Sequence, residues 1–224
     1  AADLCNSLSE SMLEAVLNNR CQTSKQGEPL EREEMMMNRE RLSERIQHWV
    51  QSQKDESLRF VQALIQINSE NHPPTGNEKA YQEHFAGQLQ QLGAEVQQYE
   101  LNDVQGLTSH PAYMQGRDYT DRPNVVGRFP GAGGGRSLLF SGHADTVYAG
   151  TESWTYPPFS GFVHEGKLYG RGSYDMKGGM AAACMAVKCL NALDIQLKGD
   201  VWIESVVDEE HGGANGTLAG RLHG

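Results

Sequence analysis

The sequence predicts an α/β protein with a mixed, largely parallel sheet, because helical patterns alternate along it with short apolar strands. Two apolar runs, SLLFS (137–141) and DVWIESVV (200–207), are typical of strands that are buried inside a sheet. Between them, GGMAAACMAVKCLNAL (178–193) predicts a helix whose small residues allow close packing on that sheet. This alternation of element types indicates the fold class.

Three helices are expected ahead of the first strand. Residues 38–53 carry apolar side chains at helical spacing, and Asp55 can cap the N-terminus of a second helix. A third helix is expected over 77–92, where Gly93 suits the C-terminal cap. The turn-rich segment NSENHPPTGNE (68–78) separates the last two helices.

Three further strands are expected besides the two buried ones. The first two are AEVQQYEL (94–101) and NVVGRF (124–129), and the third is a short one over 167–169. A flexible turn, PGAGGG (130–135), follows the second of them.

Residues 1–34 do not continue this pattern and are predicted to be an N-terminal extension, whereas 35–224 form the domain proper. Three interpretations of the extension stay open: a non-native leader, an upstream translation artefact, or a mobile, disordered segment. The final residues, GTLAGRLHG (216–224), begin a helical pattern and stop. The chain is therefore interpreted as a fragment cut inside its domain.

Charge and composition exclude several classes of partner. The formal net charge of -10 argues against nucleic acid, whose binders carry clustered positive charge. The sequence has no apolar run long enough for a membrane span, and its start lacks the pattern of a secretory signal. Its four cysteines form no CxxC pair and suggest no disulfide framework. These features predict a cytoplasmic protein.

Three short segments carry the residues that point to chemistry. The first is SGHADTV (141–147), which places His143 and Asp145 just past the carboxyl end of the 137–141 strand. Ligands usually bind at such strand ends, imidazole binds Zn²⁺ well, and a carboxylate commonly supports a ligating histidine. Taken alone, this segment is better explained as a surface turn or a satisfied polar pair.

The second segment is YGRGSYDMKGGMAA (169–182), in which Asp175 follows a glycine-rich loop and precedes a helix. A carboxylate held there could bridge two cations, although an aspartate at this position could also simply cap the helix. The segment lacks the GxxxxGK[ST] pattern of a phosphate loop, and no GxGxxG opens the helix.

The third segment is VVDEEHGGANGT (206–217), which puts Asp208, Glu209 and Glu210 directly after a buried strand. One such carboxylate can bind a metal while its neighbour acts as base on water, although a solvated acidic loop is the alternative. His211 is a possible extra ligand that we expect to act locally or toward the substrate. Taken together, the three segments predict a His and carboxylate metal site for Zn²⁺, Co²⁺ or Mn²⁺.

The three segments together resemble the acetylornithine deacetylase, succinyl-diaminopimelate desuccinylase and glutamate carboxypeptidase family of co-catalytic zinc hydrolases. The matching stretches are LLFSGHADTV, WTYPPFSGFVHEGKLYGRGSYDMKGGMAA and VVDEEHGGANGT, in the same order and spacing. The resemblance covers roughly residues 40–224. It implies a three-layer sandwich, the zinc-aminopeptidase-like catalytic domain, of which residues 35–224 would be the N-terminal part.

Carried over residue by residue, the resemblance implies that His143 binds one metal ion and that Asp145 orients it. It implies that Asp175 bridges two Zn²⁺ or Co²⁺ ions, that Glu209 is the general base and that Glu210 binds the second ion. Two further ligands and a lid or dimerisation domain would lie beyond these residues. The full-length protein would accordingly form a homodimer.

The implied activity is hydrolysis of the amide bond of N-acyl amino acids in amino-acid metabolism, with an acetylornithine deacetylase favoured. A metallo-carboxypeptidase or dipeptidase of the same family is the alternative. A non-catalytic, peptide-binding pseudoenzyme is the alternative from another class. Because each metal ion would lack one protein ligand, the 224-residue chain alone is expected to bind metal weakly and to be inactive.

Overall fold

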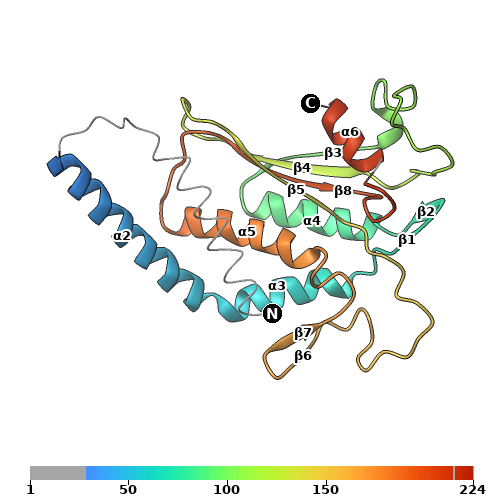
Figure 1. The fold of residues 1–224 in the computed structure, drawn as a ribbon, viewed down its shortest axis with the longest axis horizontal. Helices are drawn as coiled ribbons and strands as arrows, with labels where there is room; N and C mark the ends of the chain where they lie inside the picture. The colour runs from blue at the N-terminus through green and yellow to red at the C-terminus, as the bar shows by residue number, and fades with distance from the viewer. Residues whose placement is uncertain (1–28, 214, 224) are drawn as a thin grey trace.

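The computed structural model describes residues 29–213 and 215–223, and it has the α/β architecture that the sequence predicts. A four-stranded sheet runs in the order β3 (Glu95–Tyr99), β4 (Asn124–Phe129), β8 (Val201–Val206) and β5 (Leu138–His143). The helices α3 (Lys54–Gln66), α4 (Lys79–Gln91) and α5 (Lys177–Ala192) lie on one side of it, and α6 (Asn215–His223) lies on the other (Figure 1). The described chain therefore has the three layers expected.

The sheet is mixed, but parallel pairing does not dominate among the described strands. β5 and β8 are parallel, whereas β4 runs antiparallel to both β3 and β8. Parallel neighbours need a crossover connection, and α5 supplies one between β5 and β8. The chain from β3 to β4 contains only the short 3₁₀ helix η1 (Leu101–Asp103) and loops. The sheet is therefore mixed, as expected, but the described strands are not largely parallel.

The main core lies between the sheet and the three helices on its first face. It contains fully buried apolar side chains from every one of these layers, among them Leu64, Phe85, Cys184 and Ile203. Small residues along α5 are buried almost without exception, which brings this helix close to the sheet as predicted. The core thus fixes the N-terminus of α5 against the carboxyl ends of the strands.

The helix α2 (Pro29–Ser52) extends from the body, and its C-terminal half packs on α5 through Ile46 and Val50 (Figure 1). Because α2 begins at Pro29, the predicted boundary between residues 34 and 35 falls inside a helix. Residues 1–28, the rest of the predicted extension, lie outside the described residues. Within the described part of the chain, no helix is long and apolar enough to cross a membrane.

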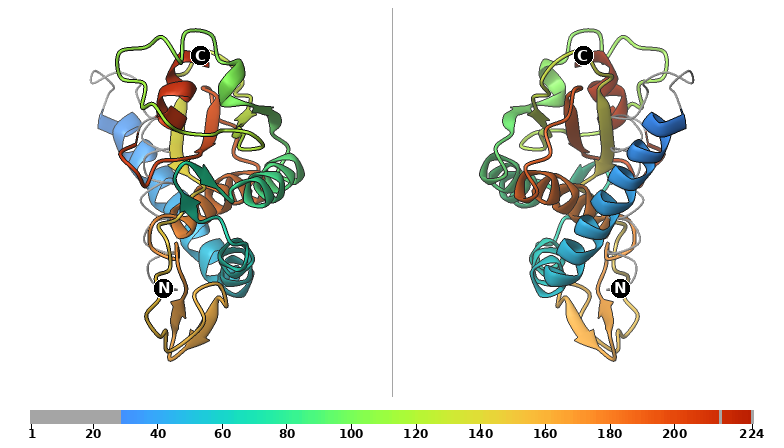
Figure 2. Two further views of the ribbon diagram at one scale, coloured as in Figure 1. Left: turned by 90° about the vertical axis from the view of Figure 1, so that its right-hand side faces the viewer. Right: turned by 90° about the vertical axis from the view of Figure 1, so that its left-hand side faces the viewer.

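Two small hairpins flank the sheet. The two helix caps that the sequence predicts, at Gly93 and Asp55, have different outcomes. The hairpins are β1 (Asn71–His72) with β2 (Thr75–Gly76), and β6 (Phe162–His164) with β7 (Lys167–Tyr169), which projects from the body (Figure 2). Gly93 follows Leu92, the C-cap residue of α4, and has a φ of 93°, as a terminating glycine should. Asp55 does not cap α3: Gln53 holds the N-cap position, and Asp55 lies in the first turn, where its charge still favours the helix dipole.

Candidate metal centre

The predicted site residues meet at the carboxyl ends of β5 and β8 because these two strands are parallel neighbours. His143, the last residue of β5, pairs with Val206, the last residue of β8. The HADTV and DEEH segments therefore leave the sheet side by side. The N-terminus of α5 brings Asp175 to the same end of the strands. Carboxyl ends of strands are the usual ligand sites of open α/β sheets.

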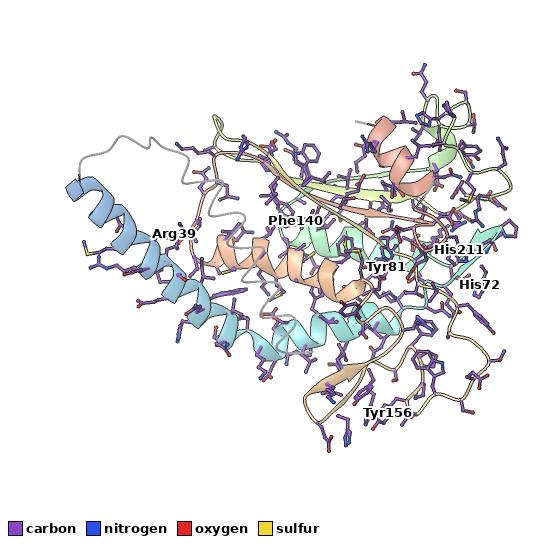
Figure 3. All side chains as sticks on the ribbon, viewed as in Figure 1. Arg39, His72, Tyr81, Phe140, Tyr156 and His211 are labelled. Carbon is purple, nitrogen blue, oxygen red and sulfur yellow. The ribbon has the colours of Figure 1, made fainter. Side chains whose placement is uncertain are left out.

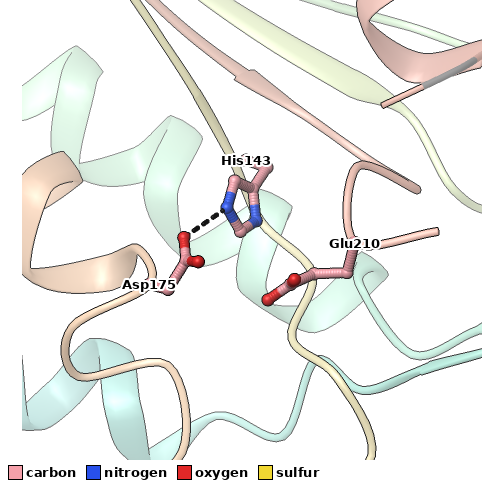
Figure 4. A group of neighbouring side chains, drawn as sticks. All are labelled: His143, Asp175 and Glu210. Atoms are coloured by element: carbon pink, nitrogen blue, oxygen red, sulfur yellow. Dashed lines mark hydrogen bonds and ion pairs between the residues drawn. The ribbon is translucent and has the colours of Figure 1, made fainter. Parts of the chain in front are cut away.

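His143, Asp175 and Glu210 form a cluster with metal-ligand chemistry (Figure 4). Each offers one ligand atom, and these atoms all lie within 4.8 Å of one another. The Nε2 atom of His143 lies 3.0 Å from Oδ1 of Asp175. One imidazole and two carboxylates suit Zn²⁺, Co²⁺ or Mn²⁺, so the residues present fit a catalytic divalent ion.

The neighbouring Glu209 lies at the mouth of the site rather than in this cluster. Its side chain is 41% exposed, and its Oε2 lies 3.8 Å from Nε2 of His143. A cavity of about 380 Å³ lies beside it, lined by residues that include His143, Asp175, Glu209 and Thr217. The carboxylate thus reaches both the cluster and the space where a substrate could enter.

Asp145 is the buried centre of the site. Its side chain accepts hydrogen bonds from the backbone N–H groups of Glu209 and Glu210, each at 3.0 Å, and its carboxylate lies 3.6 Å from Nδ1 of His143. The shortest contact of that Nδ1 is with the carbonyl oxygen of Asp145, at 2.9 Å. Burial alone raises the pKa of Asp145, but His143, Asn71 and the two N–H groups outweigh it and lower that pKa. Asp145 therefore contacts the histidine with its backbone and ties it to the acidic loop with its side chain.

Known proteins match the part of the chain that carries the three motif segments. The family model described as peptidase family M20/M25/M40 matches residues 139–223, which contain all three motif segments. The chain is 35% identical over 168 residues to the N-formyl-4-amino-5-aminomethyl-2-methylpyrimidine deformylase of Halalkalibacterium halodurans, covering 74% of this chain and 35% of the relative. The chain belongs to this family.

Two further comparisons place the M20 chain among its relatives. It is 48% identical over 86 residues to the succinyl-diaminopimelate desuccinylase of Wigglesworthia glossinidia brevipalpis, covering 38% of this chain and 23% of the relative. Human carnosine dipeptidase 1 superposes with a TM-score of 0.59 at 22% identity, covering 72% of this chain and 34% of that one, which shows a shared fold. The chain thus spans about a third or less of the length of the proteins that it matches.

The structure of the M20 chain decides between the alternative roles that the sequence leaves open for Asp175 and His211. Asp175 does not cap α5: Met176 holds the N-cap position, and the carboxylate faces His143 instead. His211 lies outside the metal cluster, and its buried Nδ1 has no hydrogen-bond partner among the described residues. It lies at the same end of the sheet as His72 (Figure 3).

Lys177 anchors the loop that carries Asp175. Its fully buried Nζ donates hydrogen bonds to the backbone carbonyls of Leu64, at 3.0 Å, and Ile67, at 2.7 Å, at the C-terminus of α3. The ammonium also lies 5.0 Å from the ring centre of Tyr81. The lysine of the DMKGG segment thus fastens the start of α5 to the end of another helix.

Several supporting residues carry no sequence signal. Asn71 and Tyr119 bond the buried acids of the site, and Asn124 accepts the N–H of Val207 and donates to the carbonyl of Gly216. Each comes from a loop or a strand end that has no motif. Asn71 lies in the turn-rich segment NSENHPPTGNE, but turn propensity alone explains an asparagine there.

Metal binding should depend on pH through His143. Burial alone lowers the pKa of His143, but hydrogen bonds and charge from Asp145 and Asp175 raise it to about 9. The metal-free imidazole is therefore protonated at pH 7, and a metal ion must displace that proton. We expect the metal affinity to rise about tenfold per pH unit toward about pH 9 and then to level off.

Calorimetric titration with Zn²⁺ between pH 6 and 8, in buffers of different ionisation heat, measures this proton release. The variant His164→Ala is the control, because that exposed histidine lies in the β6–β7 hairpin and should leave the pH dependence unchanged. An affinity that does not change over this pH range would contradict the assignment of His143 as a ligand.

Proposed function

We propose that this chain is the metal-binding part of a hydrolase that cleaves the amide bond of small N-acyl compounds. The convergence of His143, Asp175 and Glu210 beside the partly exposed side chain of Glu209 carries the proposal. The deformylase and the desuccinylase are more similar in sequence to this chain than carnosine dipeptidase 1 is. Their names describe removal of a formyl and a succinyl group, which favours N-acyl substrates. An N-acyl amino acid of the acetylornithine type fits the same chemistry.

The chain's own residues would divide the reaction between them. A divalent ion held by the cluster would acidify water and polarise the scissile carbonyl. Glu209 removes the proton of the attacking water, whose oxygen bonds to the carbonyl carbon. The same carboxylate then delivers the proton to the amine nitrogen as the C–N bond breaks, which leaves a carboxylate and an amine.

The number of ions and the identity of the metal belong to the proposal. His143 would hold one ion, Glu210 would hold the second, and the carboxylate of Asp175 would serve both. Each ion would need a further ligand besides the residues described here. We therefore propose two Zn²⁺ ions in the full-length enzyme, with Co²⁺ as a substitute, and weak binding with negligible turnover for residues 1–224 alone.

A panel of amides tests the proposal on the full-length protein with Zn²⁺ or Co²⁺ and with a chelator. The panel contains N-formyl, N-acetyl and N-succinyl compounds, including acetylornithine and succinyl-diaminopimelate, and dipeptides. We expect metal-dependent release of amine from at least one N-acyl compound. Cleavage of dipeptides alone would replace the leading proposal by a dipeptidase, and metal binding without any hydrolysis would favour a binding module.

A further inference from the structure

Asn71 lies between two buried carboxylates of the site. Its side-chain Nδ2 donates one hydrogen bond to Oδ2 of Asp145, at 2.9 Å, and a second to Oδ1 of Asp208, at 2.8 Å. The asparagine is 1% exposed, and its own N–H bonds the carbonyl of Thr146 at 2.9 Å. The side-chain amide of Asn71 thus donates one hydrogen bond to each of the two acids.

The two acids come from different strands and need such a donor. Asp145 follows β5, Asp208 follows β8, and both are fully buried. Buried carboxylates repel each other and lose hydration, so N–H donors between them stabilise the pair without adding charge. A flipped amide would present an oxygen to both acids, so the geometry assigns nitrogen to this position. The other end, Oδ1, is buried without a hydrogen-bond partner in the part of the chain that is described.

Asp208 is held away from the metal cluster by further contacts. The hydroxyl of Tyr119 donates to Oδ2 of Asp208 at 2.5 Å, and Nε of Arg117 lies 3.4 Å from the same oxygen. Asp208 also adopts a φ of 56°, a conformation that is uncommon for residues other than glycine. This turn directs the next two residues toward Asp145, whose carboxylate receives both of their N–H groups.

We infer that Asn71 is a positioning residue that holds the general base and the metal ligands in register. Through Asp145 it fixes the N–H groups of Glu209 and Glu210 and the histidine that Asp145 contacts. Through Asp208 it fixes the turn from which the two glutamates project. The inference rests on the proposed function, because positioning matters only if these residues bind metal and catalyse hydrolysis.

Two variants of the full-length protein separate the donor from the shape of the side chain. Asn71→Ala removes the amide, and Asn71→Asp keeps its size but replaces the donor by an acid facing two others. Gln82→Ala is the matched control: Gln82 is a fully buried amide whose Nε2 donates to the backbone carbonyls of Pro123 and Ser205, with no site carboxylate as partner.

Zn²⁺ affinity measured by titration is the first readout, and kcat and KM on the best N-acyl substrate are the second. We expect Asn71→Ala to weaken Zn²⁺ binding about 10- to 100-fold and to lower kcat more than it raises KM. Asn71→Asp should show a larger loss. Gln82→Ala should lower the melting temperature and keep the Zn²⁺ affinity within about twofold.

Folded Asn71→Ala protein with wild-type Zn²⁺ affinity and wild-type kcat would overturn the inference, and this holds even if Asn71→Asp fails to fold. Equal losses of Zn²⁺ affinity in Asn71→Ala and Gln82→Ala would overturn it too, because general destabilisation would then be the cause. Wild-type protein that neither binds Zn²⁺ nor hydrolyses amides would instead refute the proposed function, and the inference with it.

Discussion

Replacing Glu209 by glutamine should lower the kcat of the full-length enzyme by about 10²- to 10⁴-fold and leave its Zn²⁺ affinity close to that of the wild type. Glutamine keeps the size and the backbone hydrogen bond to Asp145 but cannot take up a proton. The metal should stay because the ligand cluster comprises His143, Asp175 and Glu210, and Glu209 lies outside it. Steady-state kinetics with a parallel Zn²⁺ titration measure both quantities.

Glu165→Gln is the control for this substitution, because Glu165 is an exposed acid in the β6–β7 turn, away from the site. It should leave kcat and Zn²⁺ affinity unchanged. A Glu209→Gln enzyme that keeps more than half of the wild-type kcat would exclude Glu209 as the base. A large loss of Zn²⁺ affinity in that variant would make Glu209 a ligand instead.

The substitution Arg122→Met should destabilise the fold by about 3–5 kcal/mol. Arg122 and Glu78 form a buried, bidentate ion pair, with Nε–Oε2 and Nη2–Oε1 distances of 2.9 and 2.6 Å. Burial already raises the pKa of Glu78, and without the arginine its carboxylate would be left unpaired in the interior. Urea unfolding of the variant and the wild type measures the difference.

Arg128→Met is the matched control, because its ion pairs with Glu95 and Asp200 are partly exposed to solvent. Its cost should be much smaller than that of Arg122→Met, because solvent screens the exposed ion pairs. The double variant Glu78→Leu with Arg122→Met should regain much of the lost stability, since no buried charge remains unpaired. Equal losses for Arg122→Met and Arg128→Met would show that burial of the first pair does not matter energetically.

The fold class and the meeting of the three motif segments were predictable because each signal is local. An apolar run identifies β5, another identifies β8, and the small-residue pattern identifies the helix that connects them. Because those two strands are parallel neighbours, the residues that follow them must lie at the same end of the sheet. The cluster of His143, Asp175 and Glu210 follows from that topology.

The support of the site was not predictable, because it depends on contacts between segments that are far apart in the sequence. Asn71 bonds acids that lie 74 and 137 residues further along the chain, and no periodicity links these positions. The antiparallel placement of β4 was missed for a related reason, since a strand pattern does not encode the direction of its neighbour. The capping role expected for Asp55 failed because the helix begins one residue before it.

Anomalous X-ray diffraction from crystals of the full-length protein grown with Zn²⁺ tests the central claim most directly. The account predicts an anomalous peak at the zinc edge about 2.0–2.2 Å from Nε2 of His143 and from a carboxylate oxygen of Asp175 or Glu210. A crystal of the His143→Ala variant should lose that peak. An ordered zinc ion elsewhere, with His143, Asp175 and Glu210 unliganded at saturating Zn²⁺, would contradict the assignment of this edge of the sheet as the metal centre.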